Sequence, residues 1–189
     1  MRISRTTIPD IIIFEPDVYG DNRGFFMETF RDEWFTELGL SPEFVQDNHS
    51  RSTLGVLRGL HLQTKNTQGK LIRVIQGEIY DIAVDMRIDS PTYGQWVGEY
   101  LSAENKKILW VPEGFAHGFV VTSENAQTLY KCTDFYDPTS EKSIVWDDKT
   151  LAIQWPENVM AHVQLSEKDK NAQSFYRGLG FQAGKWVEP

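Results

Sequence analysis

The segment VLRGLHLQ (56–63) has the apolar composition of a buried β-strand, yet it carries Arg58 and His61 three residues apart. Fully buried strands seldom contain two such side chains. From the residues alone, His61 can be a metal ligand, a general base, or a core histidine with satisfied hydrogen bonds. A second segment, PEGFAH (112–117), places His117 directly after a Pro/Gly turn, where a structural role and a ligand role are both open.

Both segments belong to a predicted series of β-strands. From about Gly55, short apolar runs alternate with turn sequences. Their spacing predicts a mainly β fold, an antiparallel sandwich or barrel with jelly roll as the leading candidate and a few short helices. The predicted strands are VLRGLHLQ, KLIRVIQ, EIYDIAVDMR, QWVGEYLS, KILWVP, GFVVTS, TLYKCTDFY and SIVW. One helix is predicted at about residues 31–38, where apolar residues recur at helical spacing and Gly39 follows.

Alternation within the strands indicates where their side chains point. In residues 78–87 one face is apolar, and the other is small and acidic, so we expect Asp81 and Asp85 to line water or a ligand cavity. In a regular strand, Arg58 and His61 would point to opposite faces. They can face one cavity only if the strand is bulged, and Gly59 between them predicts that bulge.

The composition limits the class of protein. The 189 residues suggest one domain, and a net charge of −8 argues against general affinity for nucleic acids or anionic membranes. Cys132 is the only cysteine, so no intrachain disulfide and no cysteine-based zinc site can form. The N-terminus lacks the apolar region of a signal peptide, and the longest apolar run (11–14) is too short to span a bilayer. A cytoplasmic protein is the expectation.

The histidines argue against a metal site. A transition-metal site needs about three converging protein ligands, and the chain has only four histidines: His49, His61, His117 and His162. Pro-x-Gly-x-x-His at 112–117 resembles half of the cupin jelly-roll pattern. The other half in cupins is His-x-His followed by an acidic ligand, but here His61 is followed by Gln63. We therefore predict a metal-free cupin rather than a metal-dependent one.

The order of the segments makes the resemblance more specific. The chain resembles the dTDP-4-dehydrorhamnose 3,5-epimerases, the RmlC-type sugar-nucleotide epimerases, through most of residues 1–170. The segments that carry the resemblance are GDNRGFFMETF (20–30), FVQDNHSRS (44–52), GVLRGLHLQ (55–63), QGKLIRVIQGEIYDIAVDMR (68–87), SPTYGQWVG (90–98), LSAENKKILWVPEGFAHGFVV (101–121), LYKCTDFY (129–136) and LSEKD (165–169). The tail, from about 170 to 189, has no segment that we match and is treated as an appendage to a single jelly-roll domain of residues 1–189.

The resemblance implies an isomerase. Its members are cytoplasmic homodimers whose N-terminal strands, here about residues 1–28, pair with the partner subunit. They epimerise dTDP-4-dehydro-6-deoxy-D-glucose at C3 and C5 without a cofactor. The product, dTDP-4-dehydro-β-L-rhamnose, is a precursor of L-rhamnose in surface polysaccharides.

The chemistry of that reaction suits the matched residues. Both carbons flank a ketone, so inversion needs a base on one face, an acid on the other and stabilisation of the enolate oxygen. His61 is the natural base, because the ordinary pKa of histidine is about 6.5. The resemblance implies Asp169 as its orienting partner, Tyr130 as the acid and Lys70 beside the oxyanion. Without the resemblance, Ser166 and Asp169 would read as the N-cap and N3 residues of a helix.

Other matched positions imply substrate contacts. Arginine suits phosphate through its bidentate fork, and Gln and Asn suit carbonyl and N–H groups. The implied substrate-binding residues are Arg23, Phe26, Glu28, Gln46, Asn48, Arg58, His117, Phe135, Glu141 and Lys168. We expect an aromatic among Tyr19, Phe26 and Phe135 to stack on the thymine.

Three alternatives remain open from the sequence. The nearest is a 3- or 5-mono-epimerase acting on a related dTDP-4-keto-deoxysugar. A metal-dependent cupin and a non-catalytic sugar-nucleotide binder are the alternatives of other classes.

Overall fold

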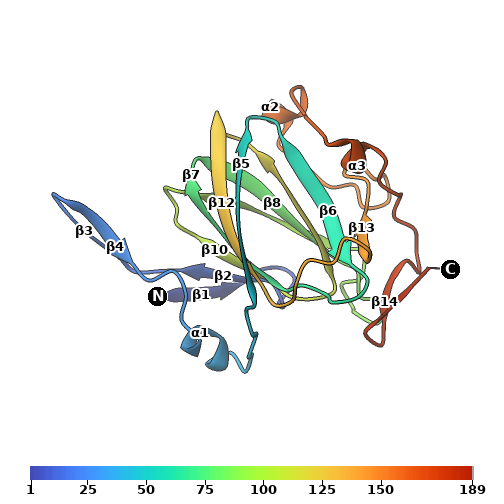
Figure 1. The fold of residues 1–189 in the computed structure, drawn as a ribbon, viewed down its shortest axis with the longest axis horizontal. Helices are drawn as coiled ribbons and strands as arrows, with labels where there is room; N and C mark the ends of the chain where they lie inside the picture. Colours follow the sequence, from blue (N-terminus) through green and yellow to red (C-terminus); the bar gives the residue numbers. More distant parts are fainter. Residues whose placement is uncertain (189) are drawn as a thin grey trace.

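Runs of alternating residues build two antiparallel β-sheets that pack face to face in the computed structural model, which describes residues 1–188 (Figure 1). The six-stranded sheet has the order β1 (Arg2–Arg5), β2 (Ile12–Glu15), β10 (Ile108–Val111), β7 (Lys70–Gln76), β12 (Asn125–Cys132) and β5 (Gln46–Thr53). The five-stranded sheet has the order β13 (Glu141–Ser143), β6 (Leu57–Gln63), β11 (Phe115–Val121), β8 (Glu78–Asp85) and β9 (Trp96–Ser102). Neighbours in each sheet are mostly not consecutive in sequence, which confirms the jelly-roll prediction.

Each strand predicted from about Gly55 onward overlaps an observed one. The strands at residues 180–187 were not predicted, and neither was β5. The sequence of β5, QDNHSRST, contains no aliphatic residue and no Phe, Tyr or Trp, and the strand lies at the edge of the six-stranded sheet. A search for apolar alternation cannot find such a strand. The predicted helix at 31–38 is a single turn, α1 (Glu33–Thr36), which packs Trp34 and Phe35 against the outer face of the six-stranded sheet.

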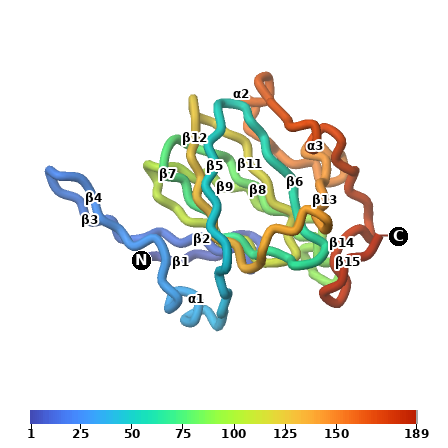
Figure 2. The backbone as a smooth tube through the Cα atoms, viewed as in Figure 1, coloured from blue at the N-terminus to red at the C-terminus, as the bar shows by residue number. Residues whose placement is uncertain are grey.

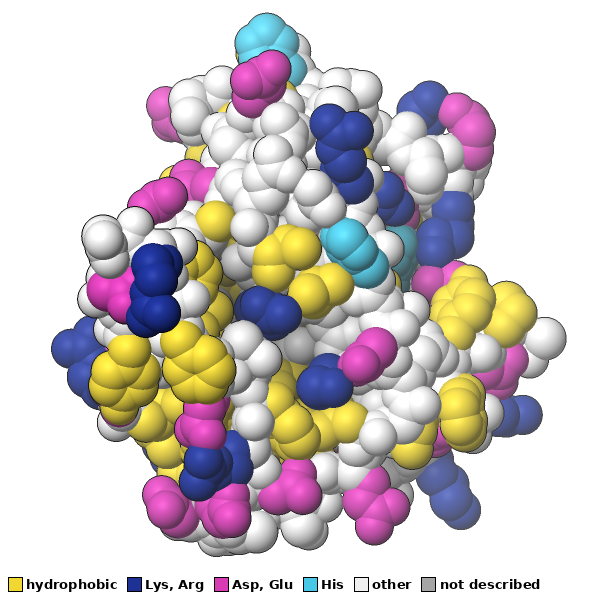
Figure 3. All heavy atoms as spheres, turned by 60° about the vertical axis from the view of Figure 1, so that its left-hand side comes forward, with side chains coloured by type: hydrophobic (Ala, Val, Ile, Leu, Met, Phe, Trp, Pro, Cys, Tyr) yellow, Lys and Arg dark blue, Asp and Glu magenta, His cyan; other side chains and the backbone are white. Residues whose placement is uncertain are grey.

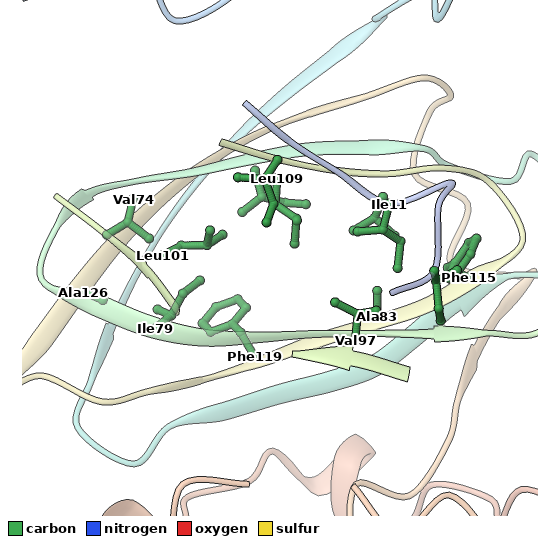
Figure 4. Close-up of a cluster of buried hydrophobic side chains, with 14 of the residues drawn as sticks. Ile11, Val74, Ile79, Ala83, Val97, Leu101, Leu109, Phe115, Phe119 and Ala126 are labelled. Carbon is green, nitrogen blue, oxygen red and sulfur yellow. The ribbon is translucent and has the colours of Figure 1, made fainter. Parts of the chain in front are cut away.

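The main core lies between the two sheets. Figure 4 shows Val74 and Leu109 of the six-stranded sheet opposite Ile79 and Phe119 of the five-stranded sheet. Burying each large aliphatic or aromatic side chain of this kind contributes about 1.5–3 kcal/mol. This packing fixes the separation of the sheets, and the cavity described below borders it.

The acidic residues of β8 lie elsewhere than predicted. Asp81 and Asp85 are both fully buried, and neither lines the cavity between the two sheets that is described below. Asp81 accepts a hydrogen bond from His117, while Asp85 accepts bonds from Arg87 and from neighbouring hydroxyl groups. The prediction of a water-lined or ligand-lined acidic face is therefore wrong. A short carboxylate can be buried when adjacent strands and loops supply its hydrogen bonds.

The C-terminal part of the chain covers the outer face of the five-stranded sheet (Figure 2). It contains α2 (Glu157–Met160), α3 (Glu167–Lys170) and the hairpin of β14 (Gly180–Gln182) and β15 (Lys185–Val187). Phe175, Leu179 and Phe181 are buried against this sheet. The segment that we treated as an appendage thus completes a second hydrophobic cluster.

A second hairpin projects from the sandwich. It consists of β3 (Val18–Asp21) and β4 (Gly24–Met27), and it stands clear of both sheets in Figure 1. Its aromatic side chains are largely exposed, 67% for Tyr19 and 68% for Phe26. Figure 3, in which the side of the molecule that carries the hairpin is turned forward, shows several groups of exposed hydrophobic side chains. No helix within residues 1–188 is long and apolar enough to cross a membrane.

Candidate functional site

A cavity of about 330 Å³ opens between the two sheets. The six-stranded sheet lines it with Gln46, Asn48, Ser50, Lys70, Ile72, Thr128 and Tyr130. The five-stranded sheet lines it with Arg58, His61, Leu62, Gln63, His117, Phe119 and Glu141, and two loops add Gln68 and Tyr136. Eight of the fourteen residues implied by the resemblance are therefore brought together in one place.

The strand that carries His61 is bulged, as predicted. His61 is the register partner of His117 and Arg58 that of Phe119, so the two residues Gly59 and Leu60 of β6 are opposite the single residue Gly118 of β11. Gly59 lies in this extra step with φ of +119°, and a Cβ there would come within 2.5 Å of the Cα of Gly118. The bulge lets Arg58 and His61 line the same cavity.

The imidazole of His61 is held by Asp169. The distance from His61 Nε2 to Asp169 Oδ1 is 2.5 Å, and Asp169 is only 3% exposed. Burial would raise the pKa of Asp169, but hydrogen bonds from His61 and Ser166 outweigh burial, so its pKa lies below the ordinary value. The carboxylate is thus charged at neutral pH and fixes the ring of His61, leaving Nδ1 as the nitrogen free to accept a proton.

Glu141 lies near that free nitrogen. Its Oε1 is 4.0 Å from His61 Nδ1, and the carboxylate is bound by Lys168 and by the hydroxyl of Tyr136, each at 2.8 Å. Burial would raise the pKa of Glu141, but these two hydrogen bonds outweigh it and lower the pKa. The carboxylate is therefore a fixed negative group beside the base.

Lys70 and Tyr130 approach the cavity from the opposite sheet. Burial lowers the pKa of the Lys70 ammonium, while the nearby negative groups Asp81 and Glu141 act against this shift, as does Cys132. Burial also raises the pKa of the Tyr130 phenol, which therefore keeps its proton at neutral pH. A protonated phenol on one sheet and the imidazole of His61 on the other thus line the same cavity.

His117 forms a second histidine–carboxylate pair. Its Nε2 lies 2.9 and 3.0 Å from the two oxygens of Asp81, which is fully buried. Unlike Asp169, Asp81 comes from the adjacent strand β8 of the same sheet. This pair fixes the orientation of His117 in the cavity wall.

Five of the implied substrate-binding residues do not line the cavity of this chain. Arg23 binds Asp21 on the projecting hairpin, Phe26 lies on the same hairpin, and Glu28 binds Arg31 just beyond it. Phe135 is 63% exposed outside the cavity lining. Lys168 lies beside the site and reaches it through its ion pair with Glu141.

The sequence reasoning overlooked Tyr136 and the role of Gln63. Tyr136 stands at the end of the segment LYKCTDFY, and no sequence pattern distinguishes it from Phe135. Gln63 is 5% exposed; its amide donates to the carbonyl oxygens of Asn66 and Phe135, and its Oε1 accepts the N–H of Asp137. The residue at the second cupin histidine position therefore holds the loop that carries Tyr136.

The donor set does not suit a metal ion. Within residues 1–188, no three His, Cys, Asp or Glu side chains converge closely enough to hold one. The hydrogen bonds of Gln63 to the loop at 135–137 also occupy its amide group.

The chain is similar in sequence to known proteins. The sequence model described as dTDP-4-dehydrorhamnose 3,5-epimerase matches residues 5–177. A dTDP-4-dehydrorhamnose 3,5-epimerase of Pseudomonas aeruginosa is 56% identical over 176 residues, covering 93% of this chain and 96% of the relative.

Solved structures are similar as well. A crystal structure of the dTDP-6-deoxy-D-glucose-3,5-epimerase of Legionella pneumophila, in complex with dTDP-4-keto-L-rhamnose, is 55% identical with a TM-score of 0.88 and 92% of each chain covered. A 3′-monoepimerase of Streptomyces bikiniensis, in complex with dTDP-quinovose, is 31% identical with a TM-score of 0.84, covering 90% of this chain and 86% of the relative.

Proposed function

The chain belongs to the dTDP-4-dehydrorhamnose 3,5-epimerase family, and from this premise we propose how its cavity carries out the family's reaction. The activity is an isomerisation: dTDP-4-dehydro-6-deoxy-D-glucose is epimerised at C3 and C5 to dTDP-4-dehydro-β-L-rhamnose. Both carbons flank the C4 ketone. At each carbon one proton leaves and one returns on the opposite face, so the reaction balances without a co-reactant.

His61 removes the proton. Asp169 accepts the Nε2–H of His61, so Nδ1 carries the lone pair that takes the proton from carbon. The electron pair of the broken C–H bond moves onto the C4 oxygen and forms an enolate. The charge of Asp169 stabilises the imidazolium that results.

Tyr130 returns a proton on the other face, and Lys70 stabilises the enolate between the two steps. The phenol is protonated because burial raises its pKa. The Lys70 ammonium lies in the same cavity and offsets the negative charge on the C4 oxygen. One such donor typically lowers the barrier by about 3–4 kcal/mol. His61 then loses its proton and Tyr130 regains one, both by exchange with water.

The observation that carries the proposal is that His61 and Tyr130 lie on different sheets. His61 comes from the five-stranded sheet and Tyr130 from the six-stranded sheet, and both line the cavity between them. A sugar ring bound in that cavity presents one face to each sheet. Inversion requires this arrangement, because removal and return of the proton on the same face would restore the starting stereochemistry.

Turnover in D₂O tests the function. We expect deuterium at both C3 and C5 of the product, detected by NMR and mass spectrometry. Label at one carbon would identify a mono-epimerase, the activity named for the Streptomyces bikiniensis relative. The absence of label with unchanged substrate would contradict an epimerase acting on this sugar and leave a binding function.

The remaining cavity residues are proposed to bind the nucleotide. Arg58 is held by a hydrogen bond from its Nε to Ser52, and its guanidinium suits the diphosphate. Gln46 and Asn48 bind each other and line the cavity with amide groups that suit the sugar or thymine. His117 and Glu141 complete the polar wall, and Lys168 contributes through its ion pair with Glu141.

We further propose that the working form is a homodimer in the cytoplasm, with residues 1–189 as one domain per subunit. The exposed aromatics of the β3–β4 hairpin favour a partner that covers them. Arg23, Phe26 and Glu28 lie on or next to this hairpin, away from the cavity of their own chain. A second copy that receives the hairpin would gain these three side chains for its own cavity.

Mixed dimers test this arrangement. Arg23→Ala and His61→Asn are each expected to be weakly active alone. After co-refolding, one cavity of the mixed dimer combines an intact His61 with an intact Arg23 from the partner, so activity should recover. If Arg23 acts within its own chain, no cavity regains both groups and activity stays low. A monomer in sedimentation at micromolar concentration would contradict the dimer.

A further inference from the structure

We propose that Ser166 is a positioning residue of the epimerase: its hydroxyl fixes the carboxylate of Asp169, and thereby the orientation of His61. The inference rests on the function proposed above. Asp169 is carried by α3, a helix of four residues that lies 108 positions from His61 along the chain. A helix this short has little intrinsic stability and cannot by itself hold a side chain in one orientation.

The hydroxyl of Ser166 makes two contacts with the same residue. Its Oγ accepts the backbone N–H of Asp169 at 3.1 Å, which is the N-cap bond of the helix. It also donates to Asp169 Oδ2 at 2.8 Å. One hydroxyl therefore fixes both the backbone and the carboxylate of Asp169.

The two carboxylate oxygens of Asp169 have separate tasks. Oδ1 receives His61 Nε2, and Oδ2 receives the Ser166 hydroxyl. If the Oδ2 contact is lost, the carboxylate can turn about its terminal torsion, and Oδ1 no longer points at His61 in a fixed direction. The imidazole then loses the partner that keeps Nδ1 free and directed into the cavity.

The two contacts of Ser166 can be separated by mutation, because the hydroxyl accepts a hydrogen bond as the helix cap and donates one to the carboxylate of Asp169. A cap needs only an acceptor for the N–H group, and aspartate is as good an N-cap as serine. Ser166→Asp therefore keeps the cap but cannot donate to Oδ2, and it adds a second negative charge beside Asp169. Ser166→Thr keeps both functions, and Ser166→Ala removes both.

A matched control lies outside the cavity. Ser90 donates its hydroxyl to Asp85 Oδ2 at 2.6 Å, and the same hydroxyl accepts the backbone N–H of Thr92 at 3.1 Å. Ser90→Ala therefore removes a comparable serine–carboxylate contact from the fold without affecting the His61 pair. Because Ser166 lies on the surface, its replacement leaves no cavity in the core.

The test compares kcat, KM and thermal stability of the four variants with the unmodified protein. Loss of a hydrogen bond to a charged group predicts a decrease in kcat of about 10-fold for Ser166→Ala with little change in KM. The decrease in kcat of Ser166→Asp should be at least as large as that of Ser166→Ala. The melting temperature of Ser166→Asp should be no lower than that of Ser166→Ala. Ser166→Thr and Ser90→Ala should retain kcat.

The pH profile gives a second readout that a purely structural role would not change. The Ser166 hydrogen bond helps to lower the pKa of Asp169. Without this bond the carboxylate is more basic and binds the protonated imidazole more strongly, so the acid limb of kcat, which reports protonation of the His61–Asp169 pair, should move to higher pH in Ser166→Ala. Ser166→Thr should keep the limb of the unmodified protein. Equal kcat in Ser166→Ala and Ser90→Ala, or full activity in Ser166→Asp, would overturn the proposal. An active His61→Asn variant would instead contradict the proposed function itself.

Discussion

The two histidine–carboxylate pairs of the cavity are close in space but differ in construction. His61 and His117 are register partners on β6 and β11. The His61 side chain is 26% exposed, and the carboxylate that binds it belongs to Asp169 on α3, which is far from His61 along the chain. The His117 side chain is 11% exposed, and its carboxylate comes from the adjacent strand and is fully buried. The two pairs thus consist of the same residue types but differ in exposure and in the element that supplies the carboxylate.

The difference indicates a division of roles. His61 lies on a bulged strand, with one nitrogen bound by Asp169 and the other open to the cavity. Asp169 is further supported by Ser166, so its charge persists while the imidazole gains and loses a proton. His117 is held by both oxygens of Asp81 inside the sandwich wall. We therefore assign proton transfer to the first pair and substrate positioning to the second.

Replacing the two histidines in turn should separate these roles most strongly. His61→Asn removes the base, and loss of such a group typically costs about 10³–10⁴-fold in kcat. His117→Asn removes one positioning contact, and we expect a decrease in kcat/KM of about 10–100-fold. Steady-state kinetics measure both effects, and calorimetry should show that dTDP still binds to His61→Asn. Equal losses in the two variants would contradict the division of roles.

Lys70 lines the same cavity from the opposite, six-stranded sheet. Lys70→Met keeps the length of the side chain but removes the ammonium, so kcat should fall by about 10²–10³-fold. Because burial of the ammonium is unfavourable, the same change should raise the free energy of unfolding by about 1 kcal/mol. Denaturant titration measures this gain.

The gain in Lys70→Met should also depend on pH. The pKa of Lys70 is lowered in the folded protein, so the charged ammonium destabilises the fold at neutral pH. This penalty begins to fall as the pH rises above the folded-state pKa and is gone only above the unfolded-state pKa, about 10.4, where the two proteins should approach equal stability. A Lys70→Met protein that is less stable at pH 7, or a stability difference independent of pH, would contradict the account.

The smallest expected effect concerns the acid stability of the His61 pair. The pKa of Asp169 is lowered in the folded state, so its charge stabilises the fold above the unfolded-state pKa, about 3.9, and this contribution is lost as the pH falls below that value. Asp169→Asn lacks the titrating group. Its free energy of unfolding should therefore change less than that of the unmodified protein between pH 6 and pH 3. Parallel pH curves would show that Asp169 does not stabilise the fold through its charge.

The sequence predicted the strands with alternating apolar residues and the bulge at Gly59, because both leave a local signature. It could not predict β5, whose residues are polar throughout. The contact between His61 and Asp169 depends on how the C-terminal segment folds back over the five-stranded sheet, so only the resemblance paired them. Tyr136 was missed because an aromatic residue in a loop has no periodicity. Arg23, Phe26 and Glu28 lie away from the cavity of their own chain, and only the proposed dimer would bring them to a cavity.

The central claim is that a base and an acid act from opposite sheets, and loss of label from substrate deuterated at C5 tests it most directly. In H₂O, Tyr130→Phe should release this deuterium to solvent while forming little inverted product, because His61 still removes and returns a proton on its own face. His61→Asn should retain the label. Release of deuterium by His61→Asn at the rate of the unmodified protein, or retention of label by Tyr130→Phe, would contradict the account.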